Sequence, residues 1–438
     1  MLSARNIQRL ARRFSTDAKQ FPANKQRFIP STGTYPKGFF AGGSHCGVKK
    51  AGKPDLAMLL SDRPTIASAV FTTNQFSAAP VQYDRGLLNS TRQAGSADVR
   101  VVVVNSGCAN AVTGKQGLKD ALAMAEAGGE RARQMDGQAA KALVMSTGVI
   151  GQQLPIDKIC QGISRQELGS SHDDWMKAAV AHMTTDTFPK LLSRTHGNIR
   201  MAGITKGAGM IHPNMATLLG TVCTDAAVTQ PLLDKALAYA VARSFNAISI
   251  DGDTSTNDTI AVLANGASNS ELISDADSKE FIEFQQQLAE FMAELAPLVV
   301  RDGEGATKFI TVEVNGARTF GDAKQVAAAI ATSALVKTAF YGQDANWGRI
   351  LCAVGYAGVP LDTTQVDMRI VPGDGSTPLE LVKAGEPQLP VDEGRAAEIL
   401  KLEDVKVQVE LNLGSEMARM YTCDLSHDYV SINADYRS

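Results

Sequence analysis

The sequence lacks a long apolar run and is poor in aromatic residues. A helix that spans a bilayer needs roughly 20 apolar residues in succession, and the mostly alanine stretch 326–336 is too short. Aromatic residues make up only 6% of the 438 residues, whereas glycine occurs 38 times. Small side chains permit close backbone packing, so we expect a layered α/β or α+β protein. Because no apolar run is long enough to span a bilayer, we expect no membrane partner.

Charge and cysteine spacing exclude further classes of site. The formal net charge is −3, and no basic face interleaved with aromatic residues appears. Nucleic acid is therefore not an expected partner. The six cysteines are scattered without a C-x-x-C pair, and the six histidines have no metal-ligand spacing. We expect reduced, mostly buried thiols rather than a disulfide framework or a zinc site.

The N-terminal residues 1–20 differ in composition from the rest. Between Met1 and Thr16 there are four arginines and no acidic residue, and Ile7, Leu10 and Phe14 give an amphipathic pattern. That composition is typical of a mitochondrial transit peptide, and the alternative is a disordered basic tail. We expect cleavage near residue 20 and a mature protein in the mitochondrial matrix.

Hydrophobic periodicity predicts interleaved strands and helices. Strands are expected over 100–104, 143–145, 217–223, 308–314, 405–413 and 418–425, and helices over 118–127, 175–183, 229–245 and 281–298. The glycines at 128–129 and 414 are interpreted as a helix end and a hairpin turn that joins the last two strands. The one internal boundary that the sequence indicates is the loop before Thr217.

Residues 206–219 are the most informative segment, because a loop rich in glycine and proline runs into an apolar strand that Thr217 opens. By itself, a threonine at the start of a strand is an ordinary β-branched residue. However, Gly207 and Gly209 permit tight backbone geometry, and Ala216 places an unhindered carbonyl beside the hydroxyl. Cleavage of the Ala216–Thr217 bond would give Thr217 a free α-amine, and a threonine with its own amine as base is an activated nucleophile.

Residues 206–219, Lys-Gly-Ala-Gly-Met-Ile-His-Pro-Asn-Met-Ala-Thr-Leu-Leu, resemble the self-cleavage motif of the ornithine acetyltransferase family, the glutamate N-acetyltransferases of the cyclic arginine pathway. Further segments resemble motifs of that family in the same order: 146–151, 183–187, 251–258, 302–308, 346–349 and 432–438. The resemblance extends from about residue 27 to the end. It implies an α+β fold in a layered αββα arrangement similar to the N-terminal-nucleophile hydrolases.

The resemblance also implies a role for each matching residue. Thr217 would be the nucleophile, both for self-cleavage between Ala216 and Thr217 and for acetyl transfer. Thr147 and Gly148 would form the oxyanion hole. The substrate contacts would be Thr184, Lys206, Thr217, Glu304, Asn433 and Ser438. Taken singly, these residues also fit a strand-ending turn, solvated charges and a frayed terminus.

The implied reaction moves an acetyl group from N-acetylornithine to Thr217 and then to glutamate. No other cofactor is needed, and whether acetyl-CoA is also a donor stays open. The α chain 21–216 and the β chain 217–438 are expected to remain together as an α2β2 heterotetramer. One alternative is an N-terminal-nucleophile amidohydrolase or aminopeptidase, and another is a non-catalytic amino-acid-binding protein with an intact chain.

Two segments fail as motifs for a metal ion or a nucleotide. An EF-hand loop beginning at Asp251 would need a central glycine and a terminal glutamate, and those positions hold Thr256 and Val262. Residues 303–308 lack the spacer between glycines that a P-loop requires. We therefore expect no metal site and no nucleotide phosphate site of these types.

Overall fold

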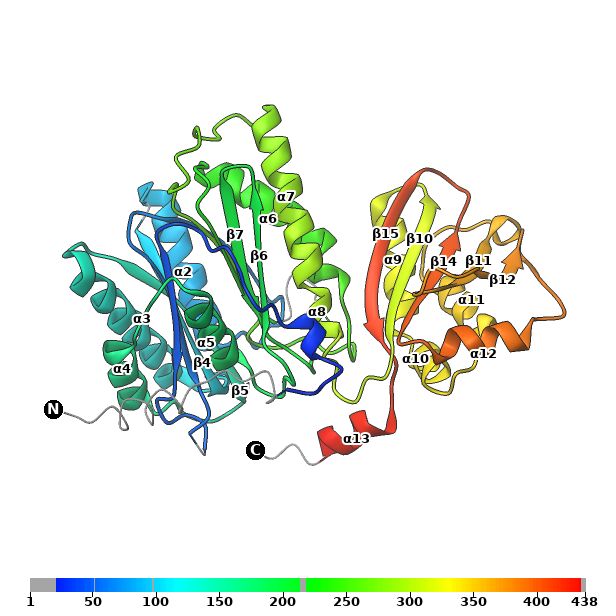
Figure 1. Ribbon diagram of the computed structural model, residues 1–438, viewed down its shortest axis with the longest axis horizontal. Coiled ribbons are helices and arrows are strands. Elements are labelled where there is room, and N and C mark those ends of the chain that lie inside the picture. The colour runs from blue at the N-terminus through cyan, green and yellow to red at the C-terminus, as the bar shows by residue number, and fades with distance from the viewer. Residues whose placement is uncertain (1–20, 51, 97, 213–217, 435–438) are drawn as a thin grey trace.

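The computed structural model describes residues 21–50, 52–96, 98–212 and 218–434. The leader 1–20, the bond between Ala216 and Thr217, and Ser438 lie outside these residues. The described chain forms a large lobe with two sheets and a smaller C-terminal lobe with a third sheet (Figure 1).

The first sheet of the large lobe has the order β1-β2-β4-β5, with β4 and β5 parallel and the other pairs antiparallel. Its strands are β1 (Phe39–Ser44), β2 (Leu56–Ser61), β4 (Val99–Cys108) and β5 (Lys141–Val149). The helices α3 (Gly114–Asp136) and α4 (Ile156–Arg165) cover its outer face, and α2 (Ala79–Ala94) packs beside β5.

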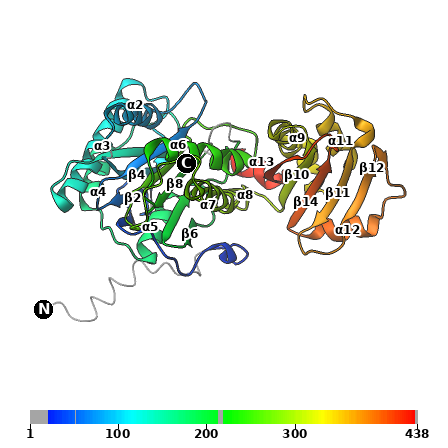
Figure 2. The same cartoon turned by 90° about the horizontal axis from the view of Figure 1, so that it is seen from above.

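The second sheet has the order β3-β9-β8-β7-β6, with β8 and β9 parallel and the other pairs antiparallel. Its strands are β3 (Ile66–Phe71), β6 (Lys190–His196), β7 (Ile199–Thr205), β8 (Leu219–Thr224) and β9 (Thr259–Ala264). The helices α6 (Gln230–Arg243) and α7 (Lys279–Leu295) cover its outer face (Figure 2).

Strand alternation divides the core of the large lobe into layers, because successive side chains of a strand point to opposite faces. In β4, Val102 and Val104 join the core between the two sheets, whereas Val101 and Val103 pack toward α3 and α4. In β9, Leu263 enters the central core and its neighbours face α6 and α7. The order of layers is helix, sheet, sheet, helix, which is the αββα arrangement that the resemblance implies.

One further helix, α5 (His172–His182), packs beside β1 and contributes Trp175 to the central core, where its ring stacks on Tyr35 with 4.8 Å between ring centroids. No described helix is long and apolar enough to cross a bilayer.

The C-terminal lobe is built on a mixed sheet of order β13-β12-β11-β14-β10-β15. Its strands are β10 (Phe309–Ala317), β11 (Asp367–Pro372), β12 (Leu379–Lys383), β13 (Glu386–Pro387), β14 (Asp404–Glu410) and β15 (Glu416–Cys423). Its helices are α9 (Phe320–Thr332), α10 (Ala334–Tyr341), α11 (Trp347–Gly355) and α12 (Glu393–Lys401). Short helices complete the described chain: α8 (Pro297–Val300), α13 (His427–Ala434) and the 3-10 turns η2 (Gln26–Phe28), η3 (Phe245–Ala247) and η4 (Thr363–Gln365). After β15, α13 returns toward the large lobe (Figure 1).

The predicted hairpin of the last two strands is wrong. β14 and β15 follow each other in sequence, but β10 lies between them, parallel to β14 and antiparallel to β15. The connection between β14 and β15 instead bonds to the end of β10, where Leu413 and Gly414 donate to the carbonyl of Gly316 at 2.7 and 2.8 Å.

Two glycines also misled the prediction of a helix end, since α3 continues through Gly128 and Gly129 to Asp136. A Cβ at Gly128 would lie 2.9 Å from Val103 Cγ2, and one at Gly129 would lie 2.4 Å from the carbonyl oxygen of Ala140. These glycines let the helix approach the first sheet closely rather than ending it. The strand predicted over 217–223 is β8, which begins at Leu219. The thiols were predicted to be mostly buried, and three of the six, Cys108, Cys223 and Cys423, are buried.

Candidate active site

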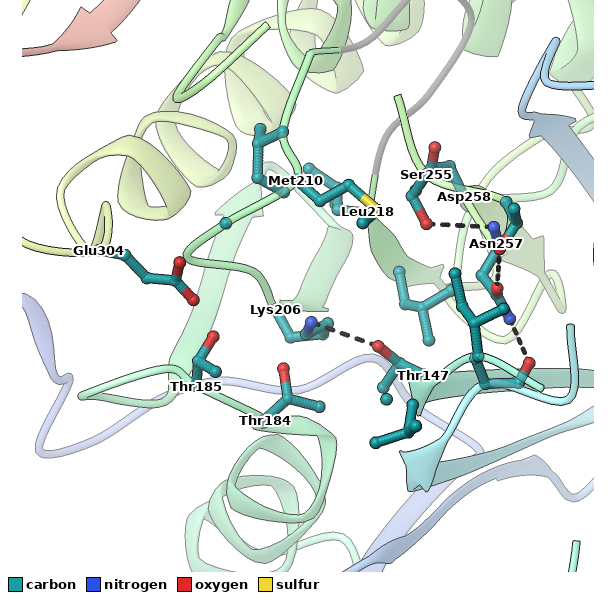
Figure 3. Close-up of a pocket in the computed structure, with 18 of the residues that line it drawn as sticks. Thr147, Thr184, Thr185, Lys206, Met210, Leu218, Ser255, Asn257, Asp258 and Glu304 are labelled. Atoms are coloured by element: carbon teal, nitrogen blue, oxygen red, sulfur yellow. Dashed lines mark hydrogen bonds between the residues drawn. The ribbon is translucent and has the colours of Figure 1, made fainter. Parts of the chain in front are cut away.

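A cavity of about 350 Å³ opens where β5 ends and β8 begins. It brings together the predicted site residues that lie in the described part of the chain: Thr147, Gly148, Thr184, Lys206, Glu304 and Asn433. The other predicted residues, Ala216, Thr217 and Ser438, lie outside the residues that the structure describes. Leu218, which is bonded directly to Thr217, also lines the cavity (Figure 3).

The end of β5 forms one wall, and its geometry requires glycine at position 148. Gly148 has φ +132, and a Cβ there would lie 2.3 Å from the carbonyl carbon of Gly107 on β4. The side-chain amide of Asn257 donates to the carbonyls of Ser146 at 2.8 Å and Ala109 at 2.5 Å. This strand end is therefore fixed from two sides.

Lys206 follows β7 and lines the cavity, with its side chain directed toward Thr147. Its Nζ donates to Thr147 Oγ1 at 3.3 Å (Figure 3). An ammonium has no acceptor, so Thr147 accepts this bond and its own hydroxyl proton remains free to donate. Burial lowers the pKa of Lys206, and this effect outweighs the opposing charges of nearby carboxylates such as Asp186.

A buried ion cluster supports the residues beside Lys206. Lys190 Nζ lies 2.6 Å from both Asp186 Oδ1 and Asp302 Oδ2, and all three side chains are fully buried. Asp186 also accepts hydrogen bonds from the backbone amides of Thr184 at 2.8 Å and Gly207 at 2.7 Å. The cluster therefore ties the two cavity segments that contain Thr184 and Lys206 to the loop at Asp302.

The pKa values of the two carboxyl groups in this cluster are shifted in opposite directions. Burial would raise the pKa of Asp186, but the charges of Lys190 and Lys206 with the Gly207 amide lower it overall. Burial raises the pKa of Asp302, and the charge of Asp186 adds to this effect.

Glu304 lies across the cavity from Thr147 (Figure 3), and Asn433 lines the cavity beside Glu304. Asn433 Nδ2 donates to Glu304 Oε2 at 2.8 Å and to the carbonyl of Tyr429 at 3.0 Å. The Glu304 amide donates to the carbonyl of Ala208 at 2.8 Å. A Cβ at Gly209 would lie 2.4 Å from Glu304 Oε2, so this glycine leaves room for the carboxylate. The two hydrogen bonds of Asn433 Nδ2 therefore connect helix α13 to the Glu304 carboxylate.

Sequence reasoning gave no role to Asn257 and Asp258, although both line the cavity. Burial raises the pKa of Asp258 well above its ordinary value, and no described group donates to or accepts from its Oδ2. The sequence did carry a signal for these two residues, because they belong to the segment 251–258, which resembles a family motif. That segment was considered only as a calcium-binding loop, and it lacks the residues that such a loop requires. Among the described residues, no cluster of histidine, cysteine, aspartate and glutamate side chains could hold a metal ion.

Comparison with known proteins identifies the family. Residues 40–438 match the model described as the ArgJ family. The chain belongs to the ArgJ family. The "Arginine biosynthesis bifunctional protein ArgJ, mitochondrial" of Verticillium alfalfae is 52% identical, over 98% of this chain and 96% of the relative. The protein of the same name from Neurospora crassa is 52% identical, over 95% of this chain and 92% of the relative.

Two solved structures are also similar in sequence to this chain. The ArgJ structure from Bacillus halodurans is 40% identical, covers 49% of this chain and 97% of its own, and has a TM-score of 0.45. The ornithine acetyltransferase of Mycobacterium tuberculosis complexed with ornithine is 37% identical, covers 43% of this chain and 98% of its own, and has a TM-score of 0.40.

Proposed function

We propose that this ArgJ-family chain is a self-cleaving mitochondrial acetyltransferase of arginine biosynthesis. It moves an acetyl group from N-acetylornithine to glutamate through an ester on Thr217, and it releases ornithine and N-acetylglutamate. The observation that supports this most directly is that Leu218, the residue bonded to Thr217, lines the same cavity as Thr147, Gly148, Lys206 and Glu304.

Self-cleavage prepares the nucleophile. The Thr217 hydroxyl attacks the carbonyl carbon of Ala216, the C–N bond between the two residues breaks, and an ester forms in its place. Water then hydrolyses that ester, which leaves a carboxylate on Ala216 and a free α-amine on Thr217. An unperturbed α-amine has a pKa of about 7.7–8.0, so a neutral fraction is available as a base near neutral pH.

Acetyl transfer repeats the same attack on a bound substrate. The α-amine of Thr217 accepts the hydroxyl proton while the oxygen attacks the acetyl carbonyl of N-acetylornithine. The Thr147 hydroxyl and the Gly148 amide stabilise the tetrahedral oxyanion, and losing one such donor costs about 3–4 kcal/mol of the barrier. The protonated amine then gives its proton to the departing α-nitrogen of ornithine.

Glutamate completes the cycle by attacking the acetyl ester with its own α-amine, so the kinetics are ping-pong. The charges of the cavity suit amino acids, with Lys206 paired to a carboxylate and Glu304 to an ammonium group. Asn433 orients Glu304 through its 2.8 Å hydrogen bond. No cofactor takes part, and acetyl-CoA serves as a second donor, as the word bifunctional in the relatives' names suggests. The two chains assemble as α2β2.

The test compares wild type with Thr217→Ala on a denaturing gel. Wild type should give two chains, the longer of them beginning at Thr217, and the variant should stay a single chain. A folded wild type that stays intact would instead indicate an amino-acid-binding protein. With acetylornithine as donor, acetylglutamate indicates the transferase, whereas free acetate alone indicates the amidohydrolase. Supplying acetyl-CoA as the only donor tests the second activity.

A further inference from the structure

Residues 249–254 run alongside residues 210–212, the last described residues before the Ala216–Thr217 bond. The Asp251 carboxylate accepts the backbone amide of Met210 on Oδ2 at 2.6 Å and that of Ile211 on Oδ1 at 2.8 Å. The Ile250 amide donates to the carbonyl of Ile211 at 2.7 Å, and Thr254 Oγ1 donates to the carbonyl of His212 at 3.0 Å. Both polar groups of the Ile211 backbone are therefore held by one short segment.

The conformation held by Asp251 is an unfavourable one. Met210 has φ +55, in the left-handed region that residues with a Cβ rarely adopt. Its side chain is 45% exposed, so packing does little to compensate for this backbone. Hydrogen bonds from an amide to a carboxylate are stronger than those to a neutral acceptor. The pair of bonds to Asp251 is thus the feature that explains why the loop turns at Met210.

Asp251 also connects this loop to the C-terminal helix. Tyr429 Oη donates to Asp251 Oδ2 at 3.1 Å. Tyr429 belongs to α13, whose Asn433 binds Glu304 in the cavity wall. One carboxylate therefore contacts the loop before the scissile bond and the helix that completes the substrate cavity.

We propose that Asp251 is a positioning residue for self-cleavage, and that it acts by fixing the backbone at Met210 and Ile211. The inference rests on the proposed self-cleavage. Intramolecular attack is fast only when hydroxyl and carbonyl are held near the attacking geometry, and anchoring the loop reduces the freedom that must be lost. Acetyl transfer takes place after the bond has been cut, so it depends less on this anchor.

The experiment follows disappearance of the precursor on denaturing gels after cell-free synthesis of the full chain. Asp251→Asn keeps the size of the side chain but replaces one acceptor by a donor, so one of the two amides loses its partner. We expect self-cleavage to slow by about tenfold or more. Mature Asp251→Asn enzyme, collected after prolonged incubation, should keep a kcat within about threefold of wild type.

Two control variants separate this role from general effects of charge and of the C-terminal helix. Asp253→Asn removes the same charge from the same loop, and Tyr429→Phe removes the bond to Asp251 from α13. Both keep the two amide bonds and should cleave at the wild-type rate. Thr254→Val removes only the bond to the His212 carbonyl, and it should slow cleavage by a smaller factor even if Asp251→Asn folds poorly.

Wild-type cleavage rates in both Asp251→Asn and Thr254→Val would overturn the proposal. It would also be overturned if mature Asp251→Asn enzyme lost kcat as severely as the precursor lost cleavage rate, since that indicates a general structural defect. A wild-type chain that never cleaves would instead contradict the proposed function.

Discussion

Replacing Lys190 with methionine removes the cation that neutralises two buried carboxylates beneath the cavity. Its Nζ lies 2.6 Å from Asp186 and 2.6 Å from Asp302, and none of the three side chains is exposed. Methionine has a comparable length and no charge, so packing changes little. The variant must therefore bury two acids that have lost their cation.

The expected loss of stability follows from what remains around these acids. Removing one partner of a buried pair costs about 3–5 kcal/mol. Backbone amides still bond to both carboxylates, from Gly207 to Asp186 at 2.7 Å and from Thr187 to Asp302 at 2.9 Å. We therefore expect a loss near the lower limit, about 3 kcal/mol, which is a large part of a typical stability of about 5–15 kcal/mol.

Urea unfolding of the uncleaved Thr217→Ala chain measures this loss on a single polypeptide. The matched control is Lys177→Met, because Lys177 pairs with Asp174 at 3.4 Å on the surface. Such exposed pairs contribute less than about 1 kcal/mol. A Lys190→Met loss as small as the control's would refute the reasoning.

The pH dependence gives a second check. Without Lys190, the folded-state pKa of Asp302 rises further above the unfolded value of about 3.9, and the lowered pKa of Asp186 rises as well. A raised folded-state pKa of an acid costs stability above the unfolded pKa, and the cost disappears as the pH falls toward it. The deficit should therefore shrink between pH 7 and pH 4.5, and a deficit that grows on acidification would contradict the account.

Three further changes test other parts of the structure. Gly148→Ala would place a Cβ 2.3 Å from Gly107, and misplacing this oxyanion donor should lower kcat for acetylglutamate formation about 10²–10³-fold; an unchanged kcat contradicts it. Glu304→Gln should raise KM for acetylornithine by about tenfold or more while self-cleavage continues, and equal damage to both would remove Glu304 from substrate binding. Burial raises the pKa of Asp84, so this carboxyl group costs stability as the pH rises above about 4. Urea unfolding between pH 5 and 7 should show that stability falls with pH less steeply in Asp84→Asn than in wild type, by up to about 1.4 kcal/mol per pH unit; equal slopes would contradict this.

Local pattern predicted much of the fold but not the long-range pairings. The β-branched run at 100–104 is part of β4, and the helix predicted over 229–245 is α6, Gln230–Arg243. The place of β10 between β14 and β15 depends on a strand about a hundred residues earlier, which local turn signals cannot reveal. The glycines at 128–129 were predicted to end their helix, but they instead allow it to pack closely against the first sheet.

The site shows the same division. Family resemblance named Thr147, Lys206, Glu304 and Asn433, and the structure brings these residues to one cavity. The buried ion cluster that holds the cavity segments in place was not predicted, because Lys190 meets Asp302 across a separation of 112 residues. Contacts of this kind depend on how distant segments pack and leave no local pattern in the sequence.

The central claim is that Thr217 carries the acetyl group, and intact-mass spectrometry of the separated chains tests it most directly. After incubation with N-acetylornithine and no acceptor, the chain that begins at Thr217 should gain the mass of one acetyl group, and it should lose that mass when glutamate is added. Fragmentation should locate the group on Thr217. Acetylglutamate formation without any acetylated chain, or with the acetyl group on another residue, would contradict the account.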